Sequence, residues 1–183
     1  IRTAARDCDR LHVWVVAEEG AEFSAADRLH LVQDGCAALP EASRIQVHPG
    51  SVYMVSRATF PEYFLRDDSL VERGVAGLDL QLFRRHIGPA LGITDRYVGT
   101  EPLSPVTDQY NQAMRHWLQQ EPMDQPPITV HEIPRLELGG EVVSASRVRM
   151  LLHDGRLDTV ADLVPPTTLA YLCRRPTTNE GAR

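Results

Sequence analysis

The chain has 183 residues, a length that predicts one domain with a proper core, and its 43% hydrophobic and 24% charged residues are ordinary for a globular protein. Its formal net charge of −6 argues against a general binder of nucleic acids or membrane surfaces. All 19 basic residues are arginines, so a catalytic lysine is excluded within this stretch. A phosphate site must therefore use arginine, histidine, hydroxyl and main-chain groups.

Cysteine and histidine patterns point to no metal site. The three cysteines are too widely spaced for a metal-ligand pattern, and we expect free thiols in the reducing cytoplasm: Cys8, Cys36 and Cys173. The seven histidines show no paired spacing. No apolar run approaches the length of a membrane span, and no signal peptide is visible.

Apolar periodicity predicts strands and helices that alternate along the chain. Residues 1–6 are typical of the second half of a helix, which predicts that an N-terminal part precedes them. The expected strands are 11–17, 44–48, 96–99 and 128–133. The expected helices are 24–39 with Ser24 as N-cap, 79–87 ending before Pro89, 107–120 with Thr107 as cap, 146–153, 157–163 and 167–173. Trp14 and Trp117 are expected in the core.

This alternation predicts an α/β fold, a Rossmann-like doubly wound parallel sheet, in one domain over residues 1–175. The polar residues 176–183 are expected to form a disordered tail. In such sheets, ligands bind beyond the carboxyl ends of the strands. Gly99-Thr100-Glu101 and Ser144-Ala145-Ser146 each follow a strand-like run, so both are expected at the binding edge.

The segment from Ser144 to Arg149 has the pattern of a phosphate cradle at the start of a helix. Main-chain N–H groups and the positive end of the helix dipole meet there, and hydroxyls and a guanidinium add donors and charge. Arg149 lies three positions after Ser146, so both should face one side of the first turn. Helical spacing places Arg147 on another side of the helix, and the simpler interpretation is that its side chain is solvated. The alternative for Ser144 is an ordinary N-cap.

Several motifs occur in one order that resembles the nucleotidyltransferase superfamily. They are Phe23-Ser24-x-x-Asp27-Arg28, Val98-Gly99-Thr100-Glu101, Ser144-x-Ser146-x-x-Arg149 and Leu163-Val164-Pro165-Pro166. A more specific set resembles the citrate lyase ligases over residues 1–173. That set is Gly50-Ser51-Val52-Tyr53, Ser56-Arg57-Ala58-Thr59-Phe60-Pro61, Gly99-Thr100-Glu101-Pro102, Gln109-Tyr110-Asn111 and Val143-Ser144-Ala145-Ser146-Arg147-Val148-Arg149.

This resemblance implies an ATP-dependent enzyme that works with Mg²⁺ in citrate fermentation. It would use acetate to acetylate the thiol of the prosthetic group on the acyl carrier subunit of citrate lyase, releasing AMP and diphosphate. The implied route is an acetyl-adenylate, which needs charge stabilisation and in-line positioning more than a covalent protein nucleophile.

The family's histidine-x-glycine-histidine signature, which belongs to the first strand–helix turn, does not occur in these residues. The resemblance therefore predicts a chain that lacks the first strand and that signature. We expect such a chain to be inactive by itself, because it lacks the signature histidines that contact the phosphates in this family.

The resemblance implies two groups of site residues. ATP would contact Ser144, Ala145, Ser146, Arg149, Gly99, Thr100, Glu101 and Asn111. Ser56, Arg57 and Thr59 would contact the acyl group or the carrier, although a role in the fold explains that segment equally well. For Glu101 an exposed carboxylate, and for Gly99 a plain turn after the strand, are the simpler alternatives.

Two other functions stay open. One is a plain adenylyltransferase of the phosphopantetheine or nicotinamide mononucleotide type, against which the run from Ser56 to Pro61 argues. The other is a module without catalysis that binds a carrier protein. Titration with ATP–Mg²⁺ and with the acyl carrier subunit would separate this module from the enzymes.

Overall fold

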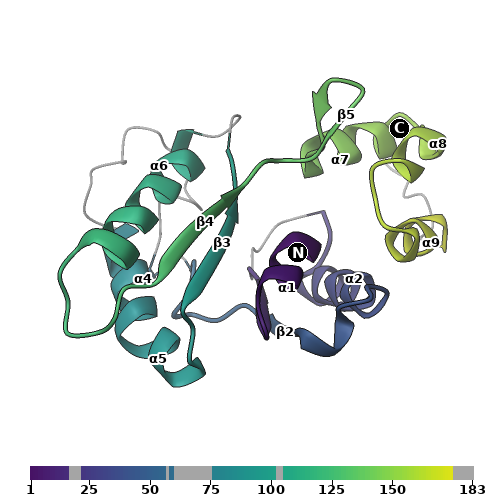
Figure 1. Cartoon of the computed structure of the whole chain (residues 1–183). Helices are drawn as coiled ribbons and strands as arrows, with labels where there is room; N and C mark the ends of the chain where they lie inside the picture. Colours follow the sequence, from purple (N-terminus) through teal and green to yellow (C-terminus); the bar gives the residue numbers. More distant parts are fainter. Residues whose placement is uncertain (17–21, 57, 60–75, 102–104, 175–183) are drawn as a thin grey trace. The chain divides into compact units, whose positions relative to one another are not determined.

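The computed structural model describes residues 1–16, 22–56, 58–59, 76–101 and 105–174 (Figure 1). Two compact units are present. The first consists of Ile1–His12, Ala26–Val47 and Leu136–Arg183, and the second of Val13–Ala25 and His48–Arg135. The fold is mixed α/β, as the alternation of strand and helix patterns predicts.

Four strands form where apolar, β-branched runs predict them. They are β1 (Leu11–Val15), β2 (Ile45–Pro49), β3 (Asp95–Gly99) and β4 (Thr129–Ile133). Within the described residues, β1 is hydrogen-bonded to β2, and β3 is parallel to β4 with Asp95 opposite Thr129 and Gly99 opposite Ile133.

The first unit is mainly helical. Its elements are α1 (Arg2–Asp7), α2 (Ala25–Ala37), the short 3₁₀ turn η1 (Ala42–Arg44), the hairpin strands β5 (Glu137–Leu138) and β6 (Glu141–Val142), α7 (Ala145–His153), α8 (Leu157–Ala161) and α9 (Pro166–Arg174). Leu151, Val160 and Leu163 are buried together and join α7 to α8. The carboxylate of Glu41 accepts a hydrogen bond from Arg6 at 3.0 Å, which lowers the pKa of Glu41.

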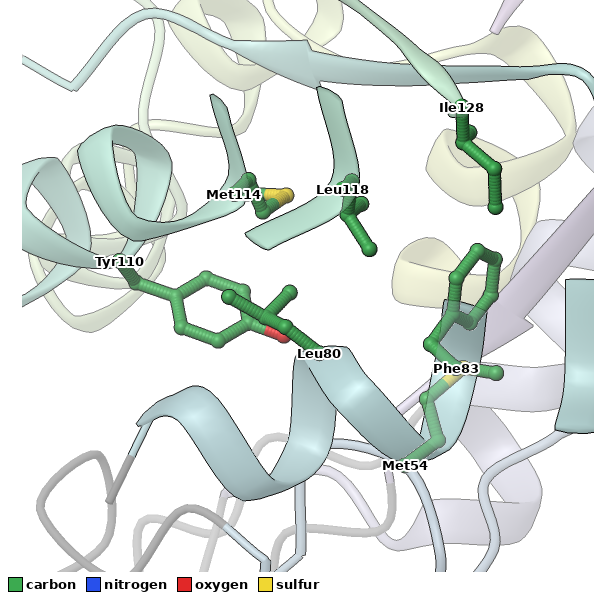
Figure 2. Close-up of a cluster of buried hydrophobic side chains, with 7 residues drawn as sticks. All are labelled: Met54, Leu80, Phe83, Tyr110, Met114, Leu118 and Ile128. Atoms are coloured by element: carbon green, nitrogen blue, oxygen red, sulfur yellow. The ribbon is translucent and has the colours of Figure 1, made fainter. Parts of the chain in front are cut away.

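The second unit packs helices against β3 and β4. Its helices are α4 (Ala76–Leu82), the π-helical turn η3 (Phe83–Ile87), α5 (Gly88–Leu91), α6 (Pro105–Met114) and the π-helical turn η4 (Arg115–Gln120). Figure 2 shows its buried side chains pointing toward one another: Met54, Leu80, Phe83, Tyr110, Met114, Leu118 and Ile128. Trp14 and Trp117 are partly buried and pack against this cluster, in accord with their expected core position.

A buried arginine holds the end of η4. Arg84 is 3% exposed, and its guanidinium donates to main-chain carbonyl groups of the η4 end and the loop that follows. The acceptors are the oxygens of Trp117 at 2.9 Å, Glu121 at 2.7 Å, Gln125 at 3.0 Å and Pro126 at 3.3 Å. A helix leaves its last carbonyl groups without helical partners, and this side chain supplies the donors.

Proline explains two of the predicted helix ends that are wrong. The helix expected to end before Pro89 continues to Leu91, because η3 shifts the hydrogen-bond register and Pro89 falls in the first turn of α5, where a missing N–H is tolerated. The helix expected to begin after Thr107 begins at Pro105, since proline is favoured at the first helical position. Positive φ angles of 65° and 78° at Gly139 and Gly140 turn the hairpin that the periodicity missed.

Cys8, Cys36 and Cys173 form no disulfide with one another. Burial raises the pKa of Cys36. Within the described part of the chain, no helix combines the length and apolar character needed to cross a membrane.

The pairing of Asp95 with His131 predicts a pH dependence of stability. Asp95 Oδ1 lies 2.7 Å from His131 Nε2, and Thr94 donates to its other oxygen at 2.7 Å. These contacts lower the pKa of Asp95, so its contribution to stability is present at neutral pH and is lost as pH falls through that lowered pKa, below about 3.9. In acid titrations followed by circular dichroism, the stability of the Asp95→Asn variant should fall less steeply with decreasing pH than that of the unaltered protein. The exposed Asp124→Asn is the control; an equal effect from it would contradict the prediction.

Candidate functional site

The chain leaves β3 through the predicted segment Gly99-Thr100-Glu101, and Arg135 fastens this segment to the end of β4. The N–H of Thr100 donates to Ile133 O at 2.9 Å, which extends the β3–β4 ladder by one bond. Arg135 Nε donates to Thr100 O at 2.9 Å, and its N–H donates to Thr100 Oγ1 at 3.2 Å. The same guanidinium forms an ion pair with Glu101, whose side chain is 6% exposed.

Asn111 of α6 holds the same strand end from its own helix. Its Nδ2 donates to Gly99 O at 2.9 Å, and the residue is 4% exposed. The neighbouring Tyr110 donates its hydroxyl to the carboxylate of Asp79. Burial raises the pKa of Tyr110, so the hydroxyl stays protonated and remains a donor. One turn of α6 therefore binds both the strand end and the helix α4.

These contacts give Glu101 and Asn111, two of the residues predicted to bind ATP, a structural role. The carboxylate of Glu101 is paired with Arg135, which argues against the exposed carboxylate that the sequence left open. The amide of Asn111 is directed at Gly99 O. Sequence reasoning missed Arg135, although it follows β4 at the same sheet edge that singled out Gly99.

The first unit contains the predicted phosphate cradle at the start of α7. Ser144 is the N-cap, and its Oγ accepts a hydrogen bond from Arg147 N–H at 3.2 Å. Arg149 Nη2 donates to Ser146 Oγ at 3.2 Å, so these two side chains share one side of the first turn, as their spacing predicts. Ser144 therefore acts as the N-cap of α7, which was the alternative interpretation. The guanidinium of Arg149 lies beside the hydroxyl of Ser146.

Arg147 faces a different way from Arg149. Its Nη2 lies 2.9 Å from Glu141 Oε2, and its Nη1 donates weakly to the carbonyl groups of Leu138 and Glu141. The side chain ties the β5–β6 hairpin to α7 and is not a freely solvated position. Of the two arginines in this turn, Arg149 is therefore the one suited to an incoming anion.

The segment expected to contact the acyl group or the carrier is turned toward its own loop. Ser56 Oγ donates to Val52 O at 2.7 Å and accepts from the N–H groups of Ala58 and Thr59 at 3.2 Å. Thr59 is 4% exposed, and its hydroxyl donates to Asp79 Oδ1 at 3.0 Å. For Ser56 and Thr59 these bonds support the role in the fold that the sequence left open, whereas Arg57 lies outside the described residues.

Within the described residues, the side chains of histidine, cysteine, aspartate and glutamate form no group of three or more that could hold a metal ion. The two candidate groups, around Gly99 and around Ser146, belong to different units of the chain.

Comparison with known proteins shows the family. The model of the citrate lyase ligase C-terminal domain matches residues 1–172. The chain belongs to this family. The [citrate [pro-3S]-lyase] ligases of Escherichia coli K12 and Klebsiella pneumoniae are each 48% identical to it over 172 residues, and that of Haemophilus influenzae is 45% identical. The resemblance inferred from the motifs is thereby confirmed.

These matches cover 94% of this chain but 48%, 49% and 50% of the three relatives, so the chain spans about half the length of the curated relatives that it matches. No solved structure gives a significant match. As a citrate lyase ligase C-terminal domain, the chain carries Ser144, Ser146, Arg149 and the Gly99–Glu101 segment within the matched region.

Proposed function

We propose that the protein carrying this chain is an ATP-dependent acid–thiol ligase. It acetylates the prosthetic-group thiol on the acyl carrier subunit of citrate lyase and releases AMP and diphosphate. The Ser146–Arg149 pair at the start of α7 carries the proposal, because it places a cation and a hydroxyl beside the positive end of a helix. The family match and the names of the relatives support the same activity.

The proposed route has two displacements. An oxygen of acetate attacks the α-phosphorus of ATP, and diphosphate leaves, which gives acetyl-adenylate. The acceptor sulfur then attacks the carbonyl carbon, AMP leaves, and the thiol proton passes to solvent. Both steps depend on positioning and on stabilising negative charge as the leaving group departs.

In this proposal, Ser144, Ala145, Ser146 and Arg149 bind phosphate oxygens, and Gly99 and Thr100 lie against the nucleoside. Glu101 and Asn111 act through the strand end, which they hold in shape together with Arg135. Mg²⁺ would be held mainly by the ATP phosphates and by water, as this ion commonly is, and would stabilise the charge of the leaving diphosphate. The reaction belongs in the cytoplasm, where ATP is abundant and thiols stay reduced.

The test is acetate-dependent exchange of labelled diphosphate into ATP by the whole protein, with no thiol present. Exchange that requires acetate and not thiol supports the acetyl-adenylate route. An adenylyltransferase would instead need nicotinamide mononucleotide or phosphopantetheine in place of acetate. A binding module would show no exchange with any acid, although it would still bind the carrier subunit.

Gly99→Ala probes the contact between the strand end and the nucleotide. A Cβ added at Gly99 would meet only the Cγ of Arg135, at 4.0 Å, within the described residues. We therefore expect the melting temperature to stay within about 2 °C of the unaltered protein. If the nucleoside lies against this backbone, the added methyl should weaken ATP binding about tenfold in isothermal titration. Equal ATP affinities in the two proteins would remove Gly99 from the site.

A further inference from the structure

The second unit contains a cavity of about 540 Å³, and neither candidate group described above contributes a described residue to it. Its walls come from three places along the chain: β1, the segment after β2, and the α4–α5 helices. Among the lining residues are Trp14, Ser51, Met54, Leu82, His86 and Leu91. This volume lies within the range of cavities that enclose a small ligand or a part of a larger one.

The chemical character of the lining residues indicates which part of the substrates could bind in this cavity. The chain has 19 arginines, but none of the described residues that line this cavity is an arginine, an aspartate or a glutamate. A triphosphate needs cations and several N–H or O–H donors. A mostly apolar wall with a few polar groups, such as Ser51 and His86, instead suits an uncharged chain.

One wall of the cavity is held in place by a fully buried carboxylate. Asp79 of α4 is 0% exposed, and its Oδ1 accepts from Val55 N–H at 2.5 Å and from the Thr59 hydroxyl at 3.0 Å. Its Oδ2 accepts the hydroxyl of Tyr110. Val55 and Thr59, which follow the lining residues Ser51 and Met54 in the chain, are therefore both hydrogen-bonded to α4.

The backbone of this loop needs such a support. Val55 has a φ of 46°, a left-handed conformation that is energetically costly for a β-branched residue. The bond from its N–H to Asp79 offsets that cost. Met54, one residue earlier, lines the cavity and is buried in the core cluster, so the geometry at Val55 sets the position of the wall.

We propose that this cavity binds the uncharged, thiol-bearing arm of the acceptor, and that Asp79 is a positioning residue that fixes the wall against which the arm lies. The inference rests on the proposed function, because that function requires an acceptor thiol besides the anionic nucleotide. A wall shaped before binding lowers the entropy cost of ordering a flexible arm.

The chain supplies its own reporter and its own reference. It has two tryptophans; Trp14 lines the cavity, whereas Trp117 lies on η4, packs beside Gly77 of α4, and is not among the described lining residues. The probe is pantetheine, an uncharged, slender chain that ends in a thiol. In the ¹⁵N-labelled whole protein, with the two indole signals assigned through Trp14→Phe and Trp117→Phe, pantetheine should shift the indole N–H signal of Trp14 and leave that of Trp117 in place. A spectrum in which neither signal moves, or in which only that of Trp117 moves, overturns the proposal.

Two exposed leucines give a matched pair of variants. Leu91 is 39% exposed and lines the cavity, whereas Leu78 is 48% exposed, lies on α4, and is not among the described lining residues. Leu91→Arg should reduce pantetheine affinity at least tenfold, and Leu78→Arg should leave it within twofold. Equal affinities in the two variants would contradict the assignment of the cavity.

Asp79 is tested by a split between two kinetic constants in the whole protein. Asp79→Asn should raise the KM for the thiol about tenfold and leave the acetate-dependent exchange of diphosphate unchanged. Tyr110→Phe removes the bond to α6 but keeps both bonds to the loop, so its KM for the thiol should stay within twofold. A parallel loss of thiol use and of exchange in Asp79→Asn indicates general damage to the fold and overturns the positioning role.

These measurements separate the two proposals. Leu91→Arg, compared with Leu78→Arg in the same kinetic assay, gives a second test of the cavity that does not depend on the indole signals. If the unaltered protein shows no exchange with acetate, the proposed function fails, and the Trp14 signal still decides whether the cavity binds the thiol arm. If exchange is normal but Leu91→Arg leaves the KM for the thiol unchanged, the cavity assignment alone fails.

Discussion

Arg84→Met should lower the free energy of unfolding by about 3–5 kcal/mol, the largest effect on stability that we expect from one substitution. Methionine fills much of the same space, but it donates no hydrogen bond. The carbonyl groups of Trp117, Glu121, Gln125 and Pro126 would lose a common donor. Buried polar groups left without partners each cost about 1–3 kcal/mol, and a small domain has only about 5–15 kcal/mol in total.

Urea unfolding followed by circular dichroism measures this effect, with Arg85→Met as the matched control. Arg85 is the next residue of η3 and is exposed, so its replacement should change stability by less than about 0.5 kcal/mol. Arg84→Lys keeps the charge but cannot reach four carbonyl groups with one ammonium, and it should lie between the two. A difference below about 1 kcal/mol between the methionine variants would show that the carbonyl groups find other donors.

Arg149→Ala should weaken the use of ATP by the whole protein about ten- to hundredfold, the largest effect on activity that we expect. The change removes one charge-assisted contact to a phosphate oxygen, worth about 1.5–3 kcal/mol. Ser146→Ala removes a neutral donor from the same side of the turn and should cost less. Steady-state measurement of kcat/KM for ATP at saturating acetate gives both values.

Arg156→Ala is the control for Arg149. Arg156 Nη2 donates to the hydroxyl of Thr159 at 3.3 Å, so the same pairing of an arginine with a hydroxyl three residues away recurs at the start of α8. Its loss should leave kcat/KM for ATP within twofold. Equal losses from Arg149→Ala and Arg156→Ala would mean that net charge, and not the cradle, governs ATP use.

Local pattern was sufficient to predict the strands β1 to β4 and the geometry of α7. Runs such as Leu11–Val15 combine apolar and β-branched residues, and the three-residue spacing of Ser146 and Arg149 places both on one side of a turn. The helix ends near Pro89 and Pro105 escaped prediction because a π-helical register and a first-turn proline depend on their helical context.

The residues that sequence reasoning missed act over distance. Arg84 binds carbonyl groups 33 to 42 positions away, and Arg135 binds Thr100 and Glu101 about 35 positions away. Every residue has a main-chain carbonyl group, so the residue types in a sequence do not reveal which carbonyl groups accept these hydrogen bonds. Asp79 lies among the apolar residues of α4. No neighbouring residue in the sequence indicates that it accepts hydrogen bonds from Val55, Thr59 and Tyr110.

The strand pair β3–β4 is fastened at both ends. Asp95 is bound to His131 near one end, and Arg135 is bound to Thr100 and Glu101 just beyond the other. A short ladder normally frays from its ends inward, so its amide hydrogens exchange with solvent at graded rates. Here neither end is free to open first. The amides of Arg96 and Val98, the two N–H groups of β3 that face β4, should therefore exchange at nearly one rate, through a single opening of the whole strand pair.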